Sequence, residues 1–484
     1  MHPEQGPQNL KFGGGVAGSV VNPAVLVVVL IAGVLILIWP RNKALVVFLS
    51  VALLIPIDQI ILLGPAHFPM QRLLSLFGIA RLIKEKISSK ARLLSGGINK
   101  IDWAVILLTV VTAIDGILLF QETGALINQL GVLYTVFGIY FLMRFLIRDE
   151  DDIVRAIQTL ACVAAVVALI MTYEVSTGHN PYAALGGAQA AQYASLAVRD
   201  DKIRALGPFA HSILAGTFGA ILLPLFVALW SKSKKYRKLA AVGVLSSTVI
   251  TIACNSSTAV MGYAAGILAL CLWPARKFTR AIRWAIVLVL ICLHLVMKGP
   301  VWSLIEKIDI SGGSSSWHRY MLVDQCIRHF GDWWLFGIKD TSVWGWDMWD
   351  TANQYVSICE NSGLLPFLLF LAVLVYGYKY LGRARRAAEK DRNAAFFIWA
   401  LGAALFANTV AFFGISYFDQ TMVVWYALLA MIPAAVTIRR KTELKAAPLS
   451  APAATPANAH AYDESDLISQ LSEKPSEFSS GQYR

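Results

Sequence analysis

The sequence predicts an all-α, polytopic integral membrane protein with about 12–13 transmembrane helices. Of its 484 residues, 57% are hydrophobic and only 15% are charged, and the mean hydropathy is +0.60. Hydrophobic runs of roughly 17–25 residues, enough to cross a hydrocarbon core of about 30 Å as helices, recur along most of the chain. Lys and Arg gather in the short connections between these runs, as the positive-inside rule describes.

The expected spans follow one another with short connections in most places. The third is short and contains Arg72 and Arg81, so it either crosses the membrane or is re-entrant, and the count is twelve or thirteen. The expected spans are 23–40, 43–64, 67–84, 101–120, 126–147, 153–173, 211–230, 238–254, 257–273, 281–298, 362–381, 394–413 and 420–438.

Composition divides the chain into three parts. Residues 1–22 form a polar N-terminal tail without the basic region and cleavage site of a secretory signal peptide. Residues 23–445 form the helical membrane domain. Residues 446–484 are rich in Ala, Pro and Ser and then acidic, so we expect a disordered cytoplasmic tail.

The Lys/Arg clusters predict the orientation. Two expected spans separate each cluster from the next, so all six lie on one side, which the positive-inside rule makes cytoplasmic. The two larger loops, 174–210 and 299–362, then face outward. The N-terminus also lies outside if the third span crosses, and inside if it is re-entrant. The clusters are at 81–100, 144–155, 232–238, 276–283, 379–392 and 439–445.

Several function classes lose their usual support. The chain has no Walker A motif, no GxGxxG strand–helix unit and no HExxH helix, which disfavours ATP-driven transport and zinc proteolysis. Its His and Asp residues lack metal-ligand spacing, so we expect no metal and no cofactor. The net charge of +12 is explained by the connections between spans, so nucleic acid is not an expected partner.

Two of the six cysteines share the loop 299–362. Cys326 and Cys359 could form a disulfide if this loop faces an oxidising compartment. The sequence alone favours two unpaired core thiols, because free cysteines are among the most buried residues.

The outer loop 174–210 contains cations where the positive-inside rule disfavours them. Arg199, Lys202 and Arg204 could bind an anionic group such as a pyrophosphate, which a guanidinium grips through two parallel hydrogen bonds. The alternative is pairing with the neighbouring residues 200–201, both Asp, and with solvent. The Gly-Pro turn at 207–208 would hold Arg204 on an ordered backbone.

The outer loop 299–362 begins its polar chemistry with an expected helix at 317–330. Tyr320, Met321, Ile327 and Phe330 recur at helical spacing, which predicts an amphipathic helix on the membrane surface with Arg319 on a different face from Arg328. Five tryptophans follow and form either an interfacial belt or stacking platforms for sugars: Trp333, Trp334, Trp344, Trp346 and Trp349.

The end of this loop leads into the span 362–381. Asp350, Asn353 and Tyr355 lie just before or within the first turns of a helix. Asp350 is either the N-cap of that helix or a general base for a sugar hydroxyl, with Asn353 and Tyr355 orienting the acceptor.

Three motifs in this order resemble the O-antigen ligase and O-antigen polymerase family of bacterial membrane glycosyltransferases. The first is R-A-L-G-P-F-A-H-S before an apolar span with Leu-Pro (204–224). The second is H-R-Y-M-L (318–322) followed by W-L-F-G (334–337). The third is N-Q-Y-V…E-N-S-G-L-L (353–365), and the resemblance extends over roughly residues 40–440.

The resemblance implies a glycosyltransferase C-like fold in the bacterial inner membrane with a periplasmic active face. It implies an undecaprenyl-pyrophosphate-linked glycan donor, a glycan or lipid-linked acceptor, and other polysaccharide-assembly proteins as further partners in the bilayer. Carried over by position, Arg204 and Arg319 would hold the pyrophosphate.

The chain departs from the family at two places. The family's ligases have a histidine before the Asn, where this chain has Ala352, and their Ser-Arg-Thr pattern is Ser-Ser-Thr at 256–258. These departures fit a polymerase or a divergent branch better than lipid A–core ligation. Asp350 or His318 would then supply any base.

Other polar residues have a structural and a functional interpretation. His211 and His318 are either surface residues or substrate contacts. Arg72 either snorkels to the interface or binds substrate. Asp58 and Asp115, within or at the ends of spans, are either functional or hydrogen-bonded between helices.

These observations predict a glycosyltransferase with Asp350, Arg319 and Arg204 as catalytic residues. His211, His318, Asn353, Tyr355 and Arg72 would bind substrate. The alternatives are a transporter or flippase of a lipid-linked glycan or anionic solute, and a non-catalytic assembly partner. A transporter would favour charged or broken helices near the midplane and related halves, which the chain does not show.

Overall fold

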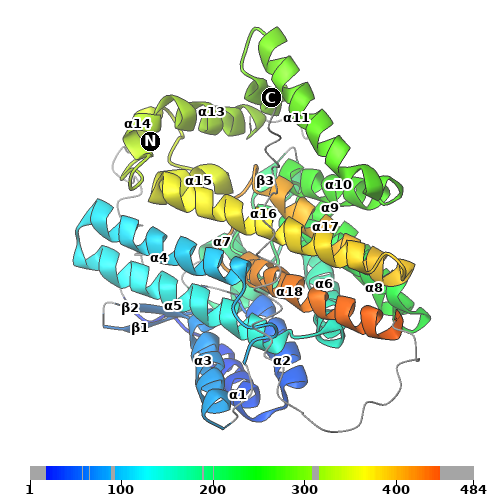
Figure 1. The fold of residues 1–484 in the computed structure, drawn as a ribbon. Coiled ribbons are helices and arrows are strands. Elements are labelled where there is room, and N and C mark those ends of the chain that lie inside the picture. The colour runs from blue at the N-terminus through cyan, green and yellow to red at the C-terminus, as the bar shows by residue number, and fades with distance from the viewer. Residues whose placement is uncertain are drawn as a thin grey trace, which may run out of the picture. The chain divides into compact units, whose positions relative to one another are not determined.

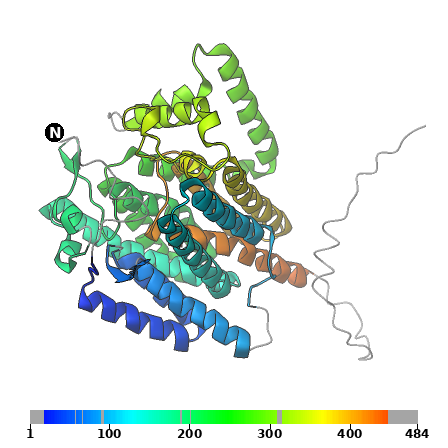
Figure 2. The same ribbon diagram turned by 90° about the vertical axis from the view of Figure 1, so that its left-hand side faces the viewer.

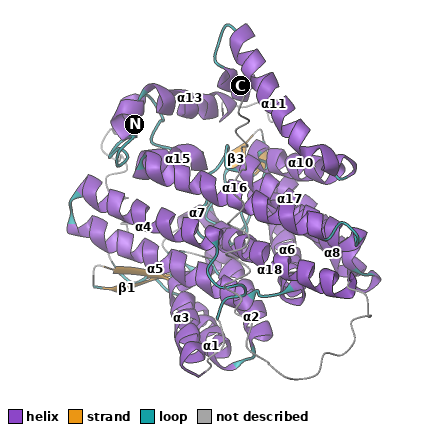
Figure 3. Cartoon of the chain, viewed as in Figure 1, coloured by secondary structure: helices purple, strands orange, loops and turns teal. Residues whose placement is uncertain are grey.

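The computed structural model describes residues 18–56, 58–64, 66–88, 93–187, 190–199, 201–307 and 315–446. Residues 1–443 form one compact unit, and its described part consists of helices with two short antiparallel ribbons (Figures 1 and 3). Most of the expected N-terminal tail and residues 447–484 of the expected C-terminal tail lie outside the described residues.

Each expected span contains a helix. These helices are α1 (Pro23–Ile38), α2 (Arg41–Leu54), α3 (Met70–Ser88), α4 (Lys100–Phe120), α5 (Thr123–Leu146), α6 (Glu150–Thr177), α8 (Ser212–Lys232), α9 (Arg237–Ala253), α10 (Ser257–Cys271), α11 (Thr279–Val296), α16 (Leu364–Ala387), α17 (Arg392–Ala411) and α18 (Gln420–Ala446).

Seven helices in the described part are long and apolar enough to cross a membrane. They are α4, α5, α6, α8, α11 with its preceding turn, α16 and α17; α1, α10 and the first part of α18 are apolar but shorter. The chain is therefore a mostly helical protein with the features of a membrane protein, and the count of 12–13 spans stays a prediction.

The second expected span, 43–64, is not one continuous helix. Instead of a helix over 43–64, α2 ends at Leu54 and a hairpin follows, formed by β1 (Ile60–Leu63) and β2 (Ala66–Pro69). The reason is local, because Pro56 disfavours helical backbone at the residue before it. Gly64 has φ +60° and makes the hairpin turn, a backbone conformation that glycine adopts without strain.

Helix α8 is the centre of the packing and packs against α6, α9, α10 and α17. Small residues allow the close approach of α9: Ser247 Oγ donates to the Gly219 carbonyl at 2.6 Å. A Cβ at Gly219 would lie 3.0 Å from the Ser247 carbonyl oxygen, so this helix pair requires glycine there.

The two ends of α8 have different chemistry. At its C-terminal end Lys232 pairs with Glu150, and Arg41 pairs with Asp152 of the same α6 turn at 3.0 Å. These contacts bring together cations from residues 41–43, 144–155 and 232–238. The 21 residues of α8 extend about 30 Å, so the other end, which follows His211, lies about one hydrocarbon thickness away.

Candidate functional site

Four segments meet beyond the N-terminal end of α8 and bring five predicted residues together. The segments are 197–211, 254–258, 315–319 and 347–353, and hydrogen bonds or electrostatic interactions join each one to the next. We call Arg204, His211, His318, Arg319 and Asp350 the polar cluster. Helices α13 (Ser315–Arg328) and α15 (Gln354–Ser362) lie on one side of the body, and α1–α3 lie on the opposite side (Figures 1 and 2).

Arg204 follows a ribbon of β3 (Val198–Arg199) and β4 (Lys202–Ile203). Its N–H donates to the Ala197 carbonyl at 2.8 Å, and the next N–H, of Ala205, donates to the Ala253 carbonyl at 3.1 Å. The backbone on both sides of the guanidinium is therefore ordered, as the Gly-Pro turn predicted.

Glu174, a residue that the sequence analysis missed, holds this backbone from α6. Its buried carboxylate accepts from the Leu206 N–H at 2.7 Å and from the Gly207 N–H at 2.8 Å. Asn180 donates to the Gly207 carbonyl at 2.9 Å, and Gln420 donates to the Pro208 carbonyl at 2.8 Å. A lone acidic residue near the outer end of a span was the signal that could have pointed to Glu174.

The guanidinium of Arg204 is partly desolvated. Its Nε is buried and has no hydrogen-bond partner in the described part of the chain. Burial lowers the pKa of Arg204, the Cys254 thiol opposes this effect, and Arg199 adds to it. A desolvated cation with an unused donor favours binding of an anion at this position.

His211 interacts electrostatically with both Arg204 and Asp350. It is the N-cap of α8, with Nδ1 accepting from the Ile213 N–H at 3.2 Å. Burial lowers the pKa of His211 and the charge of Arg204 lowers it further, whereas Asp350 raises it. The imidazole is therefore neutral at pH 7, and because Nδ1 accepts, Nε2 holds the proton and can donate it to a ligand.

Arg319 reaches from α13 to the N-terminus of α10. It donates to the Ser257 hydroxyl at 3.2 Å and to the Thr258 hydroxyl at 2.8 Å, and only 7% of the residue is exposed. A cation therefore lies against the Ser-Ser-Thr segment, which contains no arginine of its own. The N-cap of α10, Ser256, makes no side-chain cap, so the free N–H groups of the first turn add positive potential here.

The expected helix at 317–330 is present as α13, and one of its faces packs against the rest of the protein. Arg319, Leu322 and Cys326 are buried, at positions i, i+3 and i+7, whereas Ile327 and Phe330 are exposed. The helix therefore packs inward through a face that includes Arg319.

His318 connects α13 to the loop that precedes α15. Its Nε2 is 2.9 Å from the Asp350 carbonyl oxygen, and its Nδ1 is 3.9 Å from Asp347 Oδ2. Asp350 itself is exposed, and the charge of its carboxylate raises the pKa of His211. Asp350 is thus the accessible carboxylate of the polar cluster.

The N-cap of α15 is Asn353 and not Asp350. Asn353 Oδ1 accepts from the N–H groups of Tyr355 at 2.9 Å and Val356 at 3.2 Å, and the residue is buried. Tyr355 donates to the Thr409 carbonyl at 2.9 Å and packs in an aromatic group with Phe412 and others. Both side chains make structural contacts, and their role in orienting an acceptor stays a prediction.

Arg72 is not part of the polar cluster. It lies on α3 and donates to the His67 carbonyl at 2.6 Å and to the Thr135 hydroxyl at 3.0 Å. Helix α3 lies on the opposite side of the body from α13 (Figures 1 and 2). This geometry therefore does not favour the binding of one substrate by Arg72 together with Arg204 and Arg319.

Glu360 is a second acidic residue that the sequence analysis did not select. It is buried on α15, accepts from the Thr351 hydroxyl at 2.5 Å, and its Oε1 has no partner in the described part. Burial raises the pKa of Glu360 to about 8, although the Thr351 bond opposes this. Glu360 is therefore protonated at neutral pH and ties the loop of Asp350 to α15.

The five tryptophans divide into two groups. Trp333 and Trp344 are buried, with Trp333 Nε1 donating to the Cys326 carbonyl at 2.6 Å. Trp334, Trp346 and Trp349 are exposed. The exposed three remain available either for the membrane interface or for stacking on a ligand.

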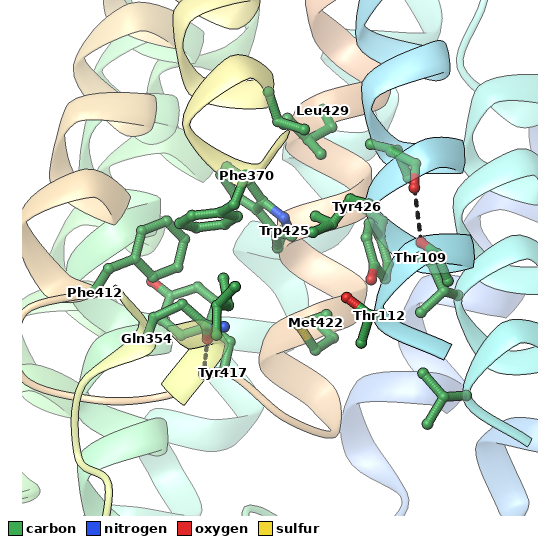
Figure 4. A pocket seen from close by; sticks show the side chains of 16 residues that line it. Thr109, Thr112, Gln354, Phe370, Phe412, Tyr417, Met422, Trp425, Tyr426 and Leu429 are labelled. Carbon is green, nitrogen blue, oxygen red and sulfur yellow. Dashed lines mark hydrogen bonds between the residues drawn. The ribbon is translucent and has the colours of Figure 1, made fainter. Parts of the chain in front are cut away.

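An apolar cavity of about 140 Å³ lies behind α15, between α4, α5, α16 and α18 (Figure 4). Phe370, Phe412 and Trp425 line it, and its polar wall includes Gln354, whose side chain accepts from the Tyr417 N–H at 2.6 Å. Gln354 directly follows the Asn353 cap, so the cavity begins next to the segment of the polar cluster. None of the five cluster residues lines it.

The polar cluster can bind an anion and place a carboxylate beside it. It combines two guanidinium groups, two imidazoles and one exposed carboxylate. Among the described residues, no group of three or more His, Cys, Asp or Glu side chains could hold a metal ion. No protein-family model matches this chain, and no curated protein sequence matches it.

Proposed function

We propose that this chain is a glycosyltransferase at the outer face of a bacterial inner membrane. It would polymerise or ligate undecaprenyl-pyrophosphate-linked saccharide units in O-antigen or exopolysaccharide biosynthesis. The observation that carries the proposal is the convergence of the segments of Arg204, Arg319 and an exposed carboxylate, Asp350, beyond the end of α8.

The roles follow from the chemistry of the reaction. As the glycosidic bond to the pyrophosphate breaks, negative charge develops on the leaving phosphate, and fixed cations stabilise this charge in a desolvated site. Arg204 has a buried donor without a partner, and the His211 Nε2–H can supply a neutral donor beside it. Asp350 would accept the proton of the attacking sugar hydroxyl, and His318 would position the Asp350 backbone.

Two further features support this proposal. The cations at the other end of α8 lie about 30 Å away, which agrees with a cytoplasmic location for them and a periplasmic location for the polar cluster. The apolar cavity behind α15 could receive part of a lipid chain, which a lipid-linked donor must place near its pyrophosphate.

The test is complementation of a strain that lacks this gene, with glycan length resolved on a gel. Arg204→Ala and Arg319→Ala should lower product formation by about 100-fold or more, the usual effect of removing one charge-stabilising donor. Lys202→Ala and Arg328→Ala are matched controls, since Lys202 is exposed two residues before Arg204 and Arg328 is exposed on the same helix as Arg319. Membrane expression is checked for each variant.

The outcomes separate the candidate functions. Single repeat units that accumulate on the lipid indicate polymerisation, and long chains that stay on the lipid but are missing from the acceptor indicate ligation. If the tested arginine variants behave as their controls do, the enzymatic assignment is wrong. A lipid-linked precursor that accumulates at the cytoplasmic face would instead indicate a flippase.

A further inference from the structure

Two thiols lie together between α13 and α15, below the polar cluster. Cys326 on α13 and Cys359 on α15 are each only 5% exposed. They belong to a second apolar cluster, separate from the main core, whose buried members are Leu322, Cys326, Trp333, Trp344, Met348, Val356 and Cys359.

The two thiols are close to each other. Helix α13 packs on α15, both cysteines belong to the same buried cluster, and Cys326 raises the pKa of the Cys359 thiol. The other four cysteines lie on different elements: Cys162 on α6, Cys254 after α9, Cys271 on α10 and Cys292 on α11. The sequence favoured two unpaired core thiols, and in the structure both thiols are free and buried, on helices that pack against each other.

We propose that Cys326 and Cys359 form a disulfide in the mature protein. The bond is made by thiol–disulfide exchange with a disulfide-bearing oxidoreductase. Two S–H bonds break and one S–S bond forms, while the disulfide of the oxidoreductase takes up the two electrons and two protons and becomes a dithiol. The proposal shares with the proposed function the outward location of residues 299–362, and it does not depend on glycosyl transfer.

The timing of the reaction follows from burial. The neighbouring Cys326 thiol and desolvation raise the pKa of the Cys359 thiol, so the reactive thiolate is disfavoured in the folded protein. Exchange therefore occurs as the outer loop folds, before the apolar cluster closes around the pair. Once the disulfide has formed, its burial in the apolar cluster also protects it from reductants.

The disulfide would hold the parts of the polar cluster together. It closes a loop from 326 to 359 that contains Asp350 and the exposed tryptophans. Cys326 lies seven residues after Arg319, two turns along the same buried face of α13. The bond therefore fixes the helix of Arg319 and His318 relative to the helix that ends the Asp350 loop.

The experiment counts free thiols in the full-length protein. Membranes are quenched with N-ethylmaleimide under denaturing conditions, and the purified chain is weighed by mass spectrometry. With six cysteines in the chain, the disulfide predicts four adducts before reduction and six after it. Cys326→Ser and Cys359→Ser should each give five without reduction, because each leaves the other thiol free.

A reporter separates this proposal from the orientation of the chain. Ser342→Cys, at an exposed position of the same loop, is tested with a membrane-impermeant maleimide on intact cells, in a chain that has both Cys326→Ser and Cys359→Ser. Six adducts in the unreduced wild type overturn the disulfide. If the reporter is labelled in that case, the outward location survives and only the disulfide is wrong; if it is not labelled, both are wrong.

Discussion

Replacing Glu174 should release the backbone that presents Arg204. Its carboxylate is the acceptor for the N–H groups of Leu206 and Gly207, at 2.7 and 2.8 Å, and all three groups are buried. In Glu174→Gln, the amide oxygen can accept a hydrogen bond from only one of the two N–H groups, and the NH₂ group would face the second N–H group. In Glu174→Ala, both N–H groups lose their acceptor.

The magnitude follows from the cost of an unpaired buried N–H, about 1–3 kcal/mol. Glu174→Gln should therefore destabilise the local closed state by about 1–3 kcal/mol and Glu174→Ala by about 2–6 kcal/mol. Because about 1.4 kcal/mol corresponds to a tenfold change in an equilibrium constant, amide exchange at residues 205–207 should be faster by about 5- to 150-fold in the Gln variant.

The assay is hydrogen–deuterium exchange with mass spectrometry on the protein in nanodiscs, following the peptide that contains 204–212. Val175→Ala is the matched control, since Val175 is an exposed neighbour on the same helix. A peptide from the buried helix α17 reports global unfolding. If the 204–212 peptide exchanges equally fast in Glu174→Ala and Val175→Ala, then Glu174 does not hold this backbone and the reasoning is refuted.

Three further predictions concern stability, measured by thermal unfolding of the purified protein. Because folding raises the pKa of Glu360 from 4.5 to about 8, the folded chain retains a proton that the unfolded chain releases, and stability falls as pH rises through this range. Between pH 5 and pH 8, the free energy of unfolding of Glu360→Gln should fall by up to about 4 kcal/mol less than that of the wild type. Equal slopes of stability against pH for the variant and the wild type would contradict this. Asn353→Ala should cost about 0.5–2 kcal/mol by removing the N-cap of α15, and Asn353→Ser, which can still cap, should restore most of it; no recovery would argue against capping. Arg144→Ala should cost about 3–5 kcal/mol, because Asp102 is buried 2.8 Å from that guanidinium, and adding Asp102→Asn should recover part of the loss if the unpaired charge is the cause.

The positions of the helices could be predicted from local sequence, since a long apolar run in water-free surroundings satisfies its backbone only as a helix. The exception at 43–64 was also local, because Pro56 and the Gly64 turn end α2 and start the hairpin. The N-cap of α15 was harder to predict. Asp350 and Asn353 are both good capping residues, and the choice depends on contacts of this segment with the 412–417 turn, such as Gln354 N–H to the Phe412 carbonyl at 2.8 Å.

The sequence by itself determined the class of the molecule and the residue types of its two outer loops, because hydropathy and charge act locally along the chain. Only the tertiary structure decided which of those residues meet. Arg204 and Arg319 are 115 positions apart, and they reach one site because α10 begins between the loop after β4 and the inward face of α13. The same packing left Arg72 with His67 and Thr135 on the other side of the body, since a side chain's neighbours depend on helix packing and not on its distance along the chain.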